Sequence, residues 1–200
     1  MDKGLLVVVS GPSGTGKGTI CKRLVEDNKD IELSVSATTR NPREGEVEGV
    51  NYYFLKVDEF KRRIECNDFL EYASVYENFY GTPKSNVVQK LNEGKSVILE
   101  IDIQGAMKVK KQYEDGVFIF VAPPSLKELR NRIVNRGTDS MEVIDKRMMC
   151  ARSEMECAIE YDYLVVNDDL ETAVKSVEAI VASEKKKANR NVDLINKIMA

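Results

Sequence analysis

Residues that could bind phosphate stand near the start of the chain, in the segment Gly11-Pro12-Ser13-Gly14-Thr15-Gly16-Lys17. The segment follows an apolar run and precedes a helical pattern, the context that a phosphate-binding loop requires. Its glycines let backbone N–H groups converge on one point, and the start of the helix adds partial positive charge. Lys17 adds a full charge. The loop is therefore predicted to hold a nucleoside triphosphate, in preference to a glycine-rich turn with a chance lysine.

Gly18 departs from the pattern that such loops follow, because a Ser or Thr that binds Mg²⁺ usually stands there. Thr19 comes next. We expect Mg²⁺ to arrive with ATP and to be held mostly by water and the phosphates, an arrangement that this ion tolerates well. A weakly protein-held metal favours a nucleotide kinase over a signalling GTPase.

A second set of phosphate ligands is predicted around Arg40 and Arg43, which stand three residues apart with a proline between them. The guanidinium fork binds phosphate bidentately, and Tyr52 and Tyr80 offer hydroxyl donors. The alternative is a pair of solvated surface arginines. Beside a phosphate loop and within an aromatic-rich segment, we favour the second phosphate site.

Two further groups of charged residues are ambiguous. The helical stretch 126–152 carries spaced arginines that indicate a mobile cover over ATP, or a salt-bridged helix face with Glu128, Glu142 and Asp145, which best explains Arg130. Glu100 and Asp102 end a buried strand, where ligands of open α/β sheets gather. Asp102 is predicted either to hold the water shell of the metal, with Glu100 on the nucleotide, or to cap the next helix.

The elements that must position these residues alternate between two periods. Short apolar runs predict buried strands at Leu5–Val9, Val97–Ile101, Val117–Val121 and Tyr163–Val166. Helical patterns cover 17–28, 104–113, 125–135, 139–159 and 169–186. This alternation predicts an α/β fold with a parallel sheet. Residues 34–83 mix aromatic, glycine and polar residues, which predicts a small, partly antiparallel lobe.

Composition excludes several classes of function. The chain has 200 residues, a net charge of −3 and no histidine, so a Ser-His-Asp or Cys-His catalytic device is excluded. The charge argues against a nucleic-acid partner, and no apolar run is long enough to cross a membrane. The N-terminus reads as a strand, not a secretory signal, and the scattered cysteines indicate reduced thiols. We expect a cytoplasmic protein, either a monomer or a homodimer.

Several long strings together resemble the guanylate kinase family, from about Leu5 to about Glu184. They are GPSGTGKGT, SATTRNPREGEVEGVNYYF, FLEYASVYENFYGTP, VILEIDIQGA, FVAPPS, RGTDS and VVND. The resemblance implies ATP-dependent phosphorylation of GMP to GDP. It also implies a P-loop NTPase core of parallel sheet flanked by helices (1–35, 84–125 and 153–200), an inserted mixed α/β GMP-binding lobe (36–83) and a helical lid (126–152).

Site residues follow from the same resemblance by motif position. The GMP phosphate would be bound by Arg40, Arg43, Tyr52 and Tyr80, and the guanine or its surroundings would be faced by Ser36, Glu71, Thr82 and Glu100. Lid arginines would close over ATP, with Arg132, Arg136 and Arg147 best placed, and Asn167 would lie near the adenine. The catalytic set is then Lys17, Arg40, Arg132, Arg136 and Arg147.

Guanine presents two adjacent donors, N1–H and the 2-amino group, which the two oxygens of the Glu71 carboxylate can accept together. Thr82 can donate to O6. These two residues argue against a kinase for another nucleoside monophosphate. The remaining alternative is a scaffold module of the same family that has lost catalysis, but such modules have degraded phosphate loops, whereas Lys17 and its loop are intact here.

Overall fold

The centre of the protein is a parallel five-stranded sheet in the order β2-β7-β1-β8-β9. The computed structural model describes residues 3–75, 77–135 and 140–200. The central strands are rich in Val, Ile and Phe and buried on both faces, as parallel sheets covered by helices require. The strands are β1 (Leu6–Ser10), β2 (Ile31–Leu33), β7 (Ser96–Glu100), β8 (Val117–Ala122) and β9 (Tyr163–Val166).

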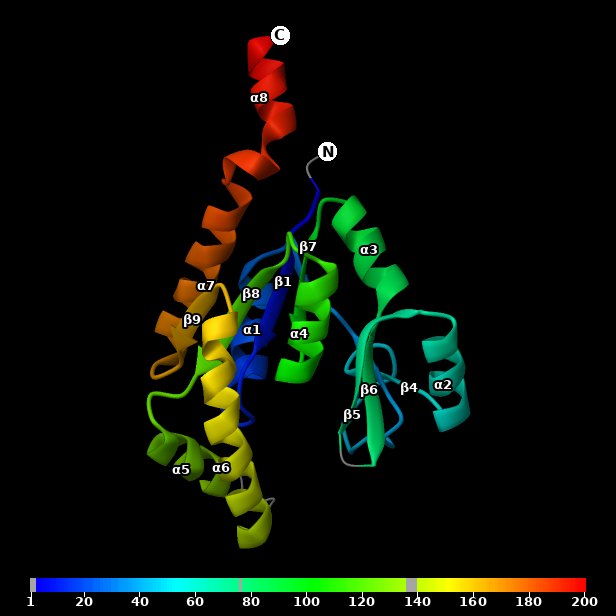
Figure 1. Ribbon diagram of the computed structural model, residues 1–200, viewed down its shortest axis with the longest axis vertical. Coiled ribbons are helices and arrows are strands. Elements are labelled where there is room, and N and C mark those ends of the chain that lie inside the picture. The colour runs from blue at the N-terminus through cyan, green and yellow to red at the C-terminus, as the bar shows by residue number, and fades with distance from the viewer. Residues whose placement is uncertain (1–2, 76, 136–139) are drawn as a thin grey trace.

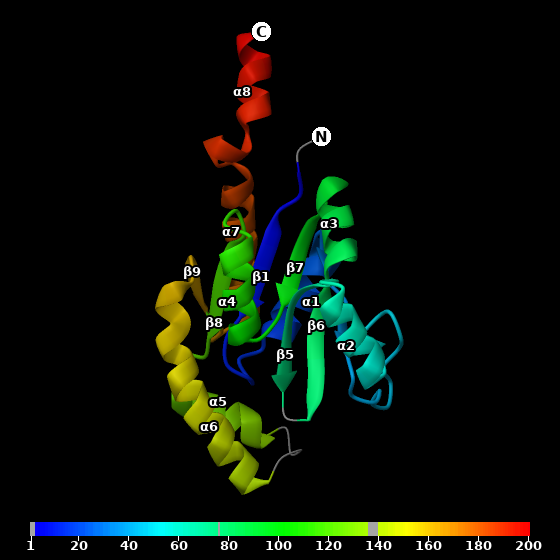
Figure 2. The ribbon, with the colours of Figure 1, turned by 45° about the vertical axis from the view of Figure 1, so that its right-hand side comes forward.

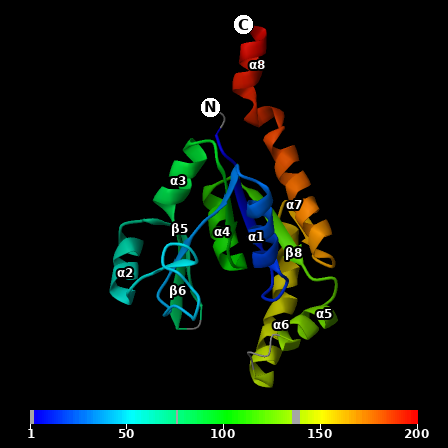
Figure 3. The ribbon, with the colours of Figure 1, turned by 180° about the vertical axis from the view of Figure 1, so that it is seen from behind.

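Helices cover both faces of this sheet (Figures 1 and 3). On one face, α1 (Lys17–Asp27) and α7 (Leu170–Lys185) pack residues such as Leu24 and Val177 against β1 and β8. On the other face, α3 (Lys84–Asn92) and α4 (Ile103–Gln112) pack Leu91 and Val109. The prediction of an α/β fold with a flanked parallel sheet is confirmed.

A second, smaller sheet lies beside the first and has the order β4-β3-β6-β5. Strands β3 and β4 pair in parallel, whereas β6 pairs antiparallel with both β3 and β5. Helix α2 (Val57–Glu65) covers it by stacking Phe60 on Phe69 and Phe79. The strands are β3 (Ser36–Thr38), β4 (Tyr52–Phe54), β5 (Phe69–Val75) and β6 (Asn78–Pro83). The expected partly antiparallel lobe is therefore present.

Two helices extend from the carboxyl end of the central strands, α5 (Leu126–Asn135) and α6 (Met141–Glu156) (Figure 2). They share a small apolar core of Leu129, Ile133, Ile144 and Ala151. The Arg130 guanidinium lies 2.6 Å from the Asp145 carboxylate and joins the two helices, as the salt-bridge alternative predicted for Arg130. A 3-10 turn (Cys157–Glu160) then leads into β9.

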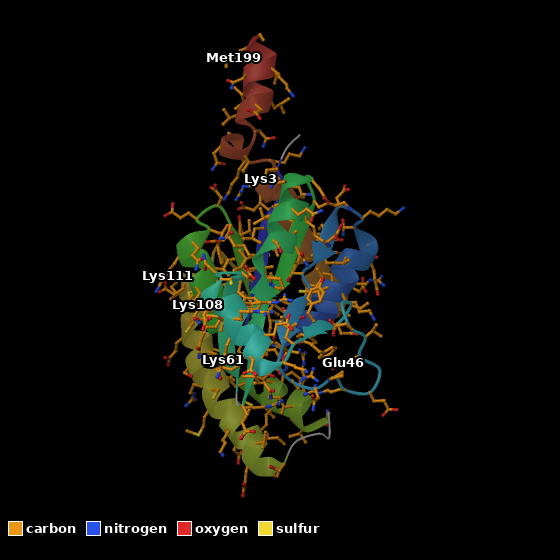
Figure 4. The ribbon with its side chains drawn as sticks, turned by 90° about the vertical axis from the view of Figure 1, so that its right-hand side faces the viewer. Lys3, Glu46, Lys61, Lys108, Lys111 and Met199 are labelled. Atoms are coloured by element: carbon orange, nitrogen blue, oxygen red, sulfur yellow. The ribbon has the colours of Figure 1, made fainter. Side chains whose placement is uncertain are left out.

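The C-terminal segment runs away from the opposite end of the sheet. Glu184 is 2% exposed and accepts hydrogen bonds from Tyr163 Oη and Arg190, which anchors the turn Ala188–Arg190. The last helix, α8 (Val192–Met199), projects beyond the body, and Met199 labels its end in Figure 4. Within the described residues, no helix combines the length and apolarity needed to cross a membrane.

Each predicted strand of the central sheet is present within one residue of its expected bounds. Strand β2 and helix α3 were not predicted individually. Strand β2 has three residues, of which one is buried, so it is too short to show a periodic pattern. Helix α3 begins at Lys84, directly after the last residue of β6, and its polar first turn hides the start of its apolar stripe.

Candidate active site

The segment 11–17 folds as a phosphate-binding loop between β1 and α1. Gly16 is the N-cap of α1, with φ 89°, and no side chain of the described residues caps it, so the first helical N–H groups point into the loop. Gly11 has φ 139°, and a Cβ there would lie 2.2 Å from the Val121 carbonyl oxygen. Both glycines are therefore required by the path of the backbone.

Lys17 and Asn167 hold the loop from two sides. The Lys17 ammonium donates to the carbonyl oxygens of Gly11 (2.7 Å) and Pro12 (3.0 Å), so it crosses the mouth of the loop. Asn167 is buried, and its Nδ2 donates to the Thr15 carbonyl oxygen at 2.7 Å. The structure thus gives Asn167 a contact with the phosphate loop, while its contact with adenine stays a prediction.

Glu100 lies beside the phosphate loop, at the end of β7. Its carboxylate oxygens are 3.2 and 3.3 Å from where a Cβ on Gly18 would stand. Although the side chain is solvent-exposed, desolvation by nearby protein raises the Glu100 pKa, and the Lys17 ammonium opposes that rise. Glu100 also adds to the rise that burial causes in the pKa of Tyr52, on the second sheet. Its contact with the guanine or its surroundings stays a prediction.

The predicted acceptor-phosphate residues Arg40, Tyr52 and Tyr80 gather on the second sheet. The Arg40 guanidinium lies 5.5 Å from the centre of the Tyr52 ring, and the Tyr52 and Tyr80 rings meet edge to face at 6.1 Å. The Arg40 fork binds the Glu46 carboxylate at 3.0 and 2.8 Å. Arg43 has an exposed side chain, and its backbone N–H donates to Glu46 at 2.7 Å.

Glu71 and Thr82 stand opposite each other on β5 and β6, and both are buried. Thr82 Oγ1 donates to Glu71 Oε1 at 2.7 Å. Burial raises the Glu71 pKa to about 7, although the bond from Thr82 lowers it and nearby Asp102 adds to the rise. Ser36 begins β3 and is partly exposed. The pair therefore presents one carboxylate whose proton is gained and lost near neutral pH.

Asp102 is the N-cap of α4, because its Oδ1 accepts from the Gly105 N–H at 2.8 Å. The capping role that the sequence left open is thus present. Asp102 also adds to the rise that burial causes in the pKa of Glu71. A contact between Asp102 and the water shell of a metal stays a prediction.

The arginines predicted to cover ATP differ in their contacts and in their exposure. Arg132 donates from Nε to Glu128 at 3.0 Å and from Nη1 to the Asn167 carbonyl oxygen at 2.9 Å. It is thereby joined to the residue that braces the phosphate loop. Arg147 is partly buried on α6, and Arg136 lies outside the described residues.

Glu46 was not predicted as a site residue, although it stands in the string around Arg40. The carboxylate binds both nitrogens of the Arg40 fork and the Arg43 N–H, so it organises the turn that carries both arginines. The signal available in the sequence was an acidic residue at the end of a Pro- and Gly-containing loop that starts with arginine.

Comparisons with known proteins agree with this geometry. The model of the guanylate kinase family matches residues 3–184. A guanylate kinase of Caldanaerobacter subterraneus subsp. tengcongensis is 57% identical over 98% of this chain and 95% of its own length. One of Clostridioides difficile is 54% identical over 96% of this chain and 94% of its own.

A solved structure gives the same result at the level of the fold. The crystal structure of guanylate kinase from Anaplasma phagocytophilum superposes with a TM-score of 0.79 at 35% identity, and the match covers 94% of this chain and 90% of that one. The strings that suggested the family in the sequence fall within the matched span. The chain belongs to the guanylate kinase family.

Proposed function

We propose that the guanylate kinase activity of this chain is carried by two phosphate sites that meet at Glu100. Lys17 and loop 11–19 bind the triphosphate of ATP, and Arg40, Arg43, Tyr52 and Tyr80 bind the phosphate of GMP. The observation that supports this is the position of Glu100. Burial raises the pKa of Glu100 and the Lys17 ammonium opposes that rise, while Glu100 in turn adds to the rise that burial causes in the pKa of Tyr52.

In this proposal the acceptor needs no general base. The second pKa of a phosphate monoester is about 6, so GMP is mostly dianionic at neutral pH. The difficulty is to bring two anions together while water stays out. Arg40 and Arg43 orient the acceptor, and Lys17 with the loop N–H groups holds the donor and the charge that develops during transfer.

We further propose a division of labour among three parts of the chain. Residues 1–35, 84–125 and 153–200 form the core, 36–83 form the GMP lobe, and 126–152 form a lid that closes over ATP. Arg132, Arg136 and Arg147 belong to the lid. The hydrogen bond from Arg132 to the Asn167 carbonyl oxygen supports this proposal, because it connects α5 to a residue that contacts the phosphate loop.

The residues near Gly18 fit a magnesium ion that is delivered with ATP. Mg²⁺ prefers oxygen ligands and keeps several waters, and the Glu100 carboxylate faces the loop at the position where a protein hydroxyl is missing. Glu100 would hold water of the metal, and Asp102 would do so more remotely. When bound, the ion neutralises charge on the transferring phosphates.

Glu71, Thr82 and Ser36 supply base recognition in this proposal. An ionised Glu71 accepts from N1–H and the 2-amino group of guanine, and Thr82 orients that carboxylate by donating its single hydroxyl proton to Oε1. Adenine has a lone pair at N1 and would leave the buried carboxylate unpaired. A site built on such bonds rejects the wrong base by roughly 10⁴ or more.

Arg40→Lys tests the acceptor site, because lysine keeps the charge and loses the bidentate fork. We expect the KM for GMP to rise about 10- to 100-fold, the value of one or more hydrogen bonds between charged groups, while the KM for ATP changes little. Arg63→Lys is the matched control, since Arg63 lies in the same lobe and pairs with Glu59 on α2. Equal increases in both KM values would move Arg40 out of the GMP site.

A further inference from the structure

The N-terminal turn of α4 leaves room for the Glu71 carboxylate only because residue 105 has no side chain. A Cβ built on Gly105 would lie 2.7 Å from Glu71 Oε2 and 3.2 Å from its carboxyl carbon. Real Cβ atoms essentially never approach another heavy atom so closely, so something must move. Glu71 Oε1 is already held by Thr82 at 2.7 Å, which leaves Oε2 against the helix backbone.

The backbone of α4 does not itself require glycine at this position. Gly105 is absent from the glycines with positive φ, and it is buried in the first turn of a regular helix. Within a helix glycine is less favourable than alanine, by up to about 1 kcal/mol. The helix therefore carries a local cost at residue 105, and the space occupied by the Glu71 carboxylate is the feature that accounts for it.

We propose that Gly105 is a specificity-determining residue, which sets the choice of guanine by letting the Glu71 carboxylate pack against the first turn of α4. The proposal rests on the proposed role of Glu71 in reading the base. With alanine at 105, the carboxylate must shift while Thr82 still holds one oxygen. The two oxygens then no longer face N1–H and the 2-amino group together. Gly105 is a positioning residue, since it acts through Glu71.

The test is Gly105→Ala, assayed by the ratio of kcat/KM for GMP to kcat/KM for IMP, which lacks the 2-amino group. We expect the ratio to fall about 10- to 100-fold, the value of one hydrogen bond to a charged group. The unfolding midpoint should stay near that of the parent protein, because the crowded atom is the end of a side chain and alanine favours the helix.

Gly116→Ala is the matched control for crowding. A Cβ there would lie 2.8 Å from Phe118 Cε2, at the start of β8 and away from Glu71. This variant should leave the GMP/IMP ratio unchanged. A Gly105→Ala ratio equal to that of the parent protein would overturn the proposal, as would an equal fall in Gly116→Ala.

Two further variants separate this proposal from the role of Glu71 itself. If Glu71→Gln leaves the GMP/IMP ratio unchanged, the proposed function of Glu71 is wrong. If Glu71→Gln lowers the ratio but Gly105→Ala leaves it unchanged, only the proposed role of Gly105 is wrong. In a Glu71→Asp background the shorter side chain removes the crowding, so adding Gly105→Ala should lower the ratio no further. If Gly105→Ala alone fails to fold, this double variant still tests the proposal, because it lacks the crowding. A double variant that fails to fold, or whose ratio falls again, refutes the proposal.

Discussion

The raised pKa of Glu71 predicts that base discrimination depends on pH in a range where most carboxylates are already ionised. The buried group has a pKa of about 7, set by desolvation against the bond from Thr82. An ionised Glu71 accepts from both guanine donors, whereas a protonated one has a hydrogen where the 2-amino group must donate. The ratio of kcat/KM for GMP to that for IMP should therefore rise with pH through about 7.

The size of the change follows from the ionised fraction. With a pKa of about 7, about a tenth of Glu71 is ionised at pH 6 and about nine tenths at pH 8. If only the ionised form holds both donors, the ratio should rise close to tenfold over this range. The ratio is the right quantity because GMP and IMP carry the same phosphate, so its titration near pH 6 cancels.

The same pKa has a consequence for stability. The folded-state pKa lies above the value of 4.5 of an unperturbed glutamate, so the protonated carboxyl stabilises the fold. That contribution is fully present below 4.5 and is lost as pH rises through about 7, on the order of 3 kcal/mol in all. Urea unfolding of the parent protein and of Glu71→Gln at pH 5 and pH 8 should show this difference only in the parent.

For the kinetic prediction, a GMP/IMP ratio that does not change with pH in the parent protein would refute the reasoning. The same inflection near pH 7 in Glu71→Gln would also refute it.

Three further outcomes follow from the phosphate loop and its neighbours. Lys17→Met should lower kcat by orders of magnitude and leave GMP binding, measured by calorimetry without ATP, nearly intact; normal turnover would contradict its role on the donor. Gly18→Ser should keep kcat within a few-fold and change the Mg²⁺ dependence only modestly, because the exposed Glu100 carboxylate can move aside and accept from the new hydroxyl; a large gain in Mg²⁺ affinity would show that the native site lacks a ligand. Arg132→Ala should raise the KM for ATP and spare GMP affinity in the absence of ATP, and equal losses for both would place Arg132 in a shared core.

The features that could be predicted from the sequence involve residues close together in the chain, and the features that were missed involve residues far apart in it. The phosphate loop is encoded within seven consecutive residues, and its glycines, lysine and flanking elements can be read without knowing the fold. The contact of Gly105 with Glu71 joins residues 34 positions apart, on a helix and on a strand of the other sheet. No local pattern predicts such a contact, because it depends on how the second sheet packs against α4.

Glu100 shows a related limit. The two carboxylates of the string VILEID stand two residues apart, the spacing that puts side chains on one face of a strand, yet only Glu100 belongs to the strand. Strand β7 ends at Glu100, and Asp102 already belongs to the start of α4 as its cap. The change from strand to helix between them turns the chain, so the alternation that orders side chains along a strand no longer applies.

The end of β7 is consequently the segment of the chain that connects the proposed site for the ATP phosphates with the proposed site for guanine. Glu100 faces the phosphate loop, and two residues later Asp102 fixes the turn of α4 whose Gly105 receives the Glu71 carboxylate. A guanine that stabilises the ionised form of Glu71 therefore binds beside segment 100–105, which also borders the donor phosphates. A base that cannot do so leaves a buried, desolvated carboxylate beside that segment. Discrimination against the wrong base is thus expected to appear in kcat as well as in KM, because the misfit lies against Gly105, five residues along the chain from Glu100.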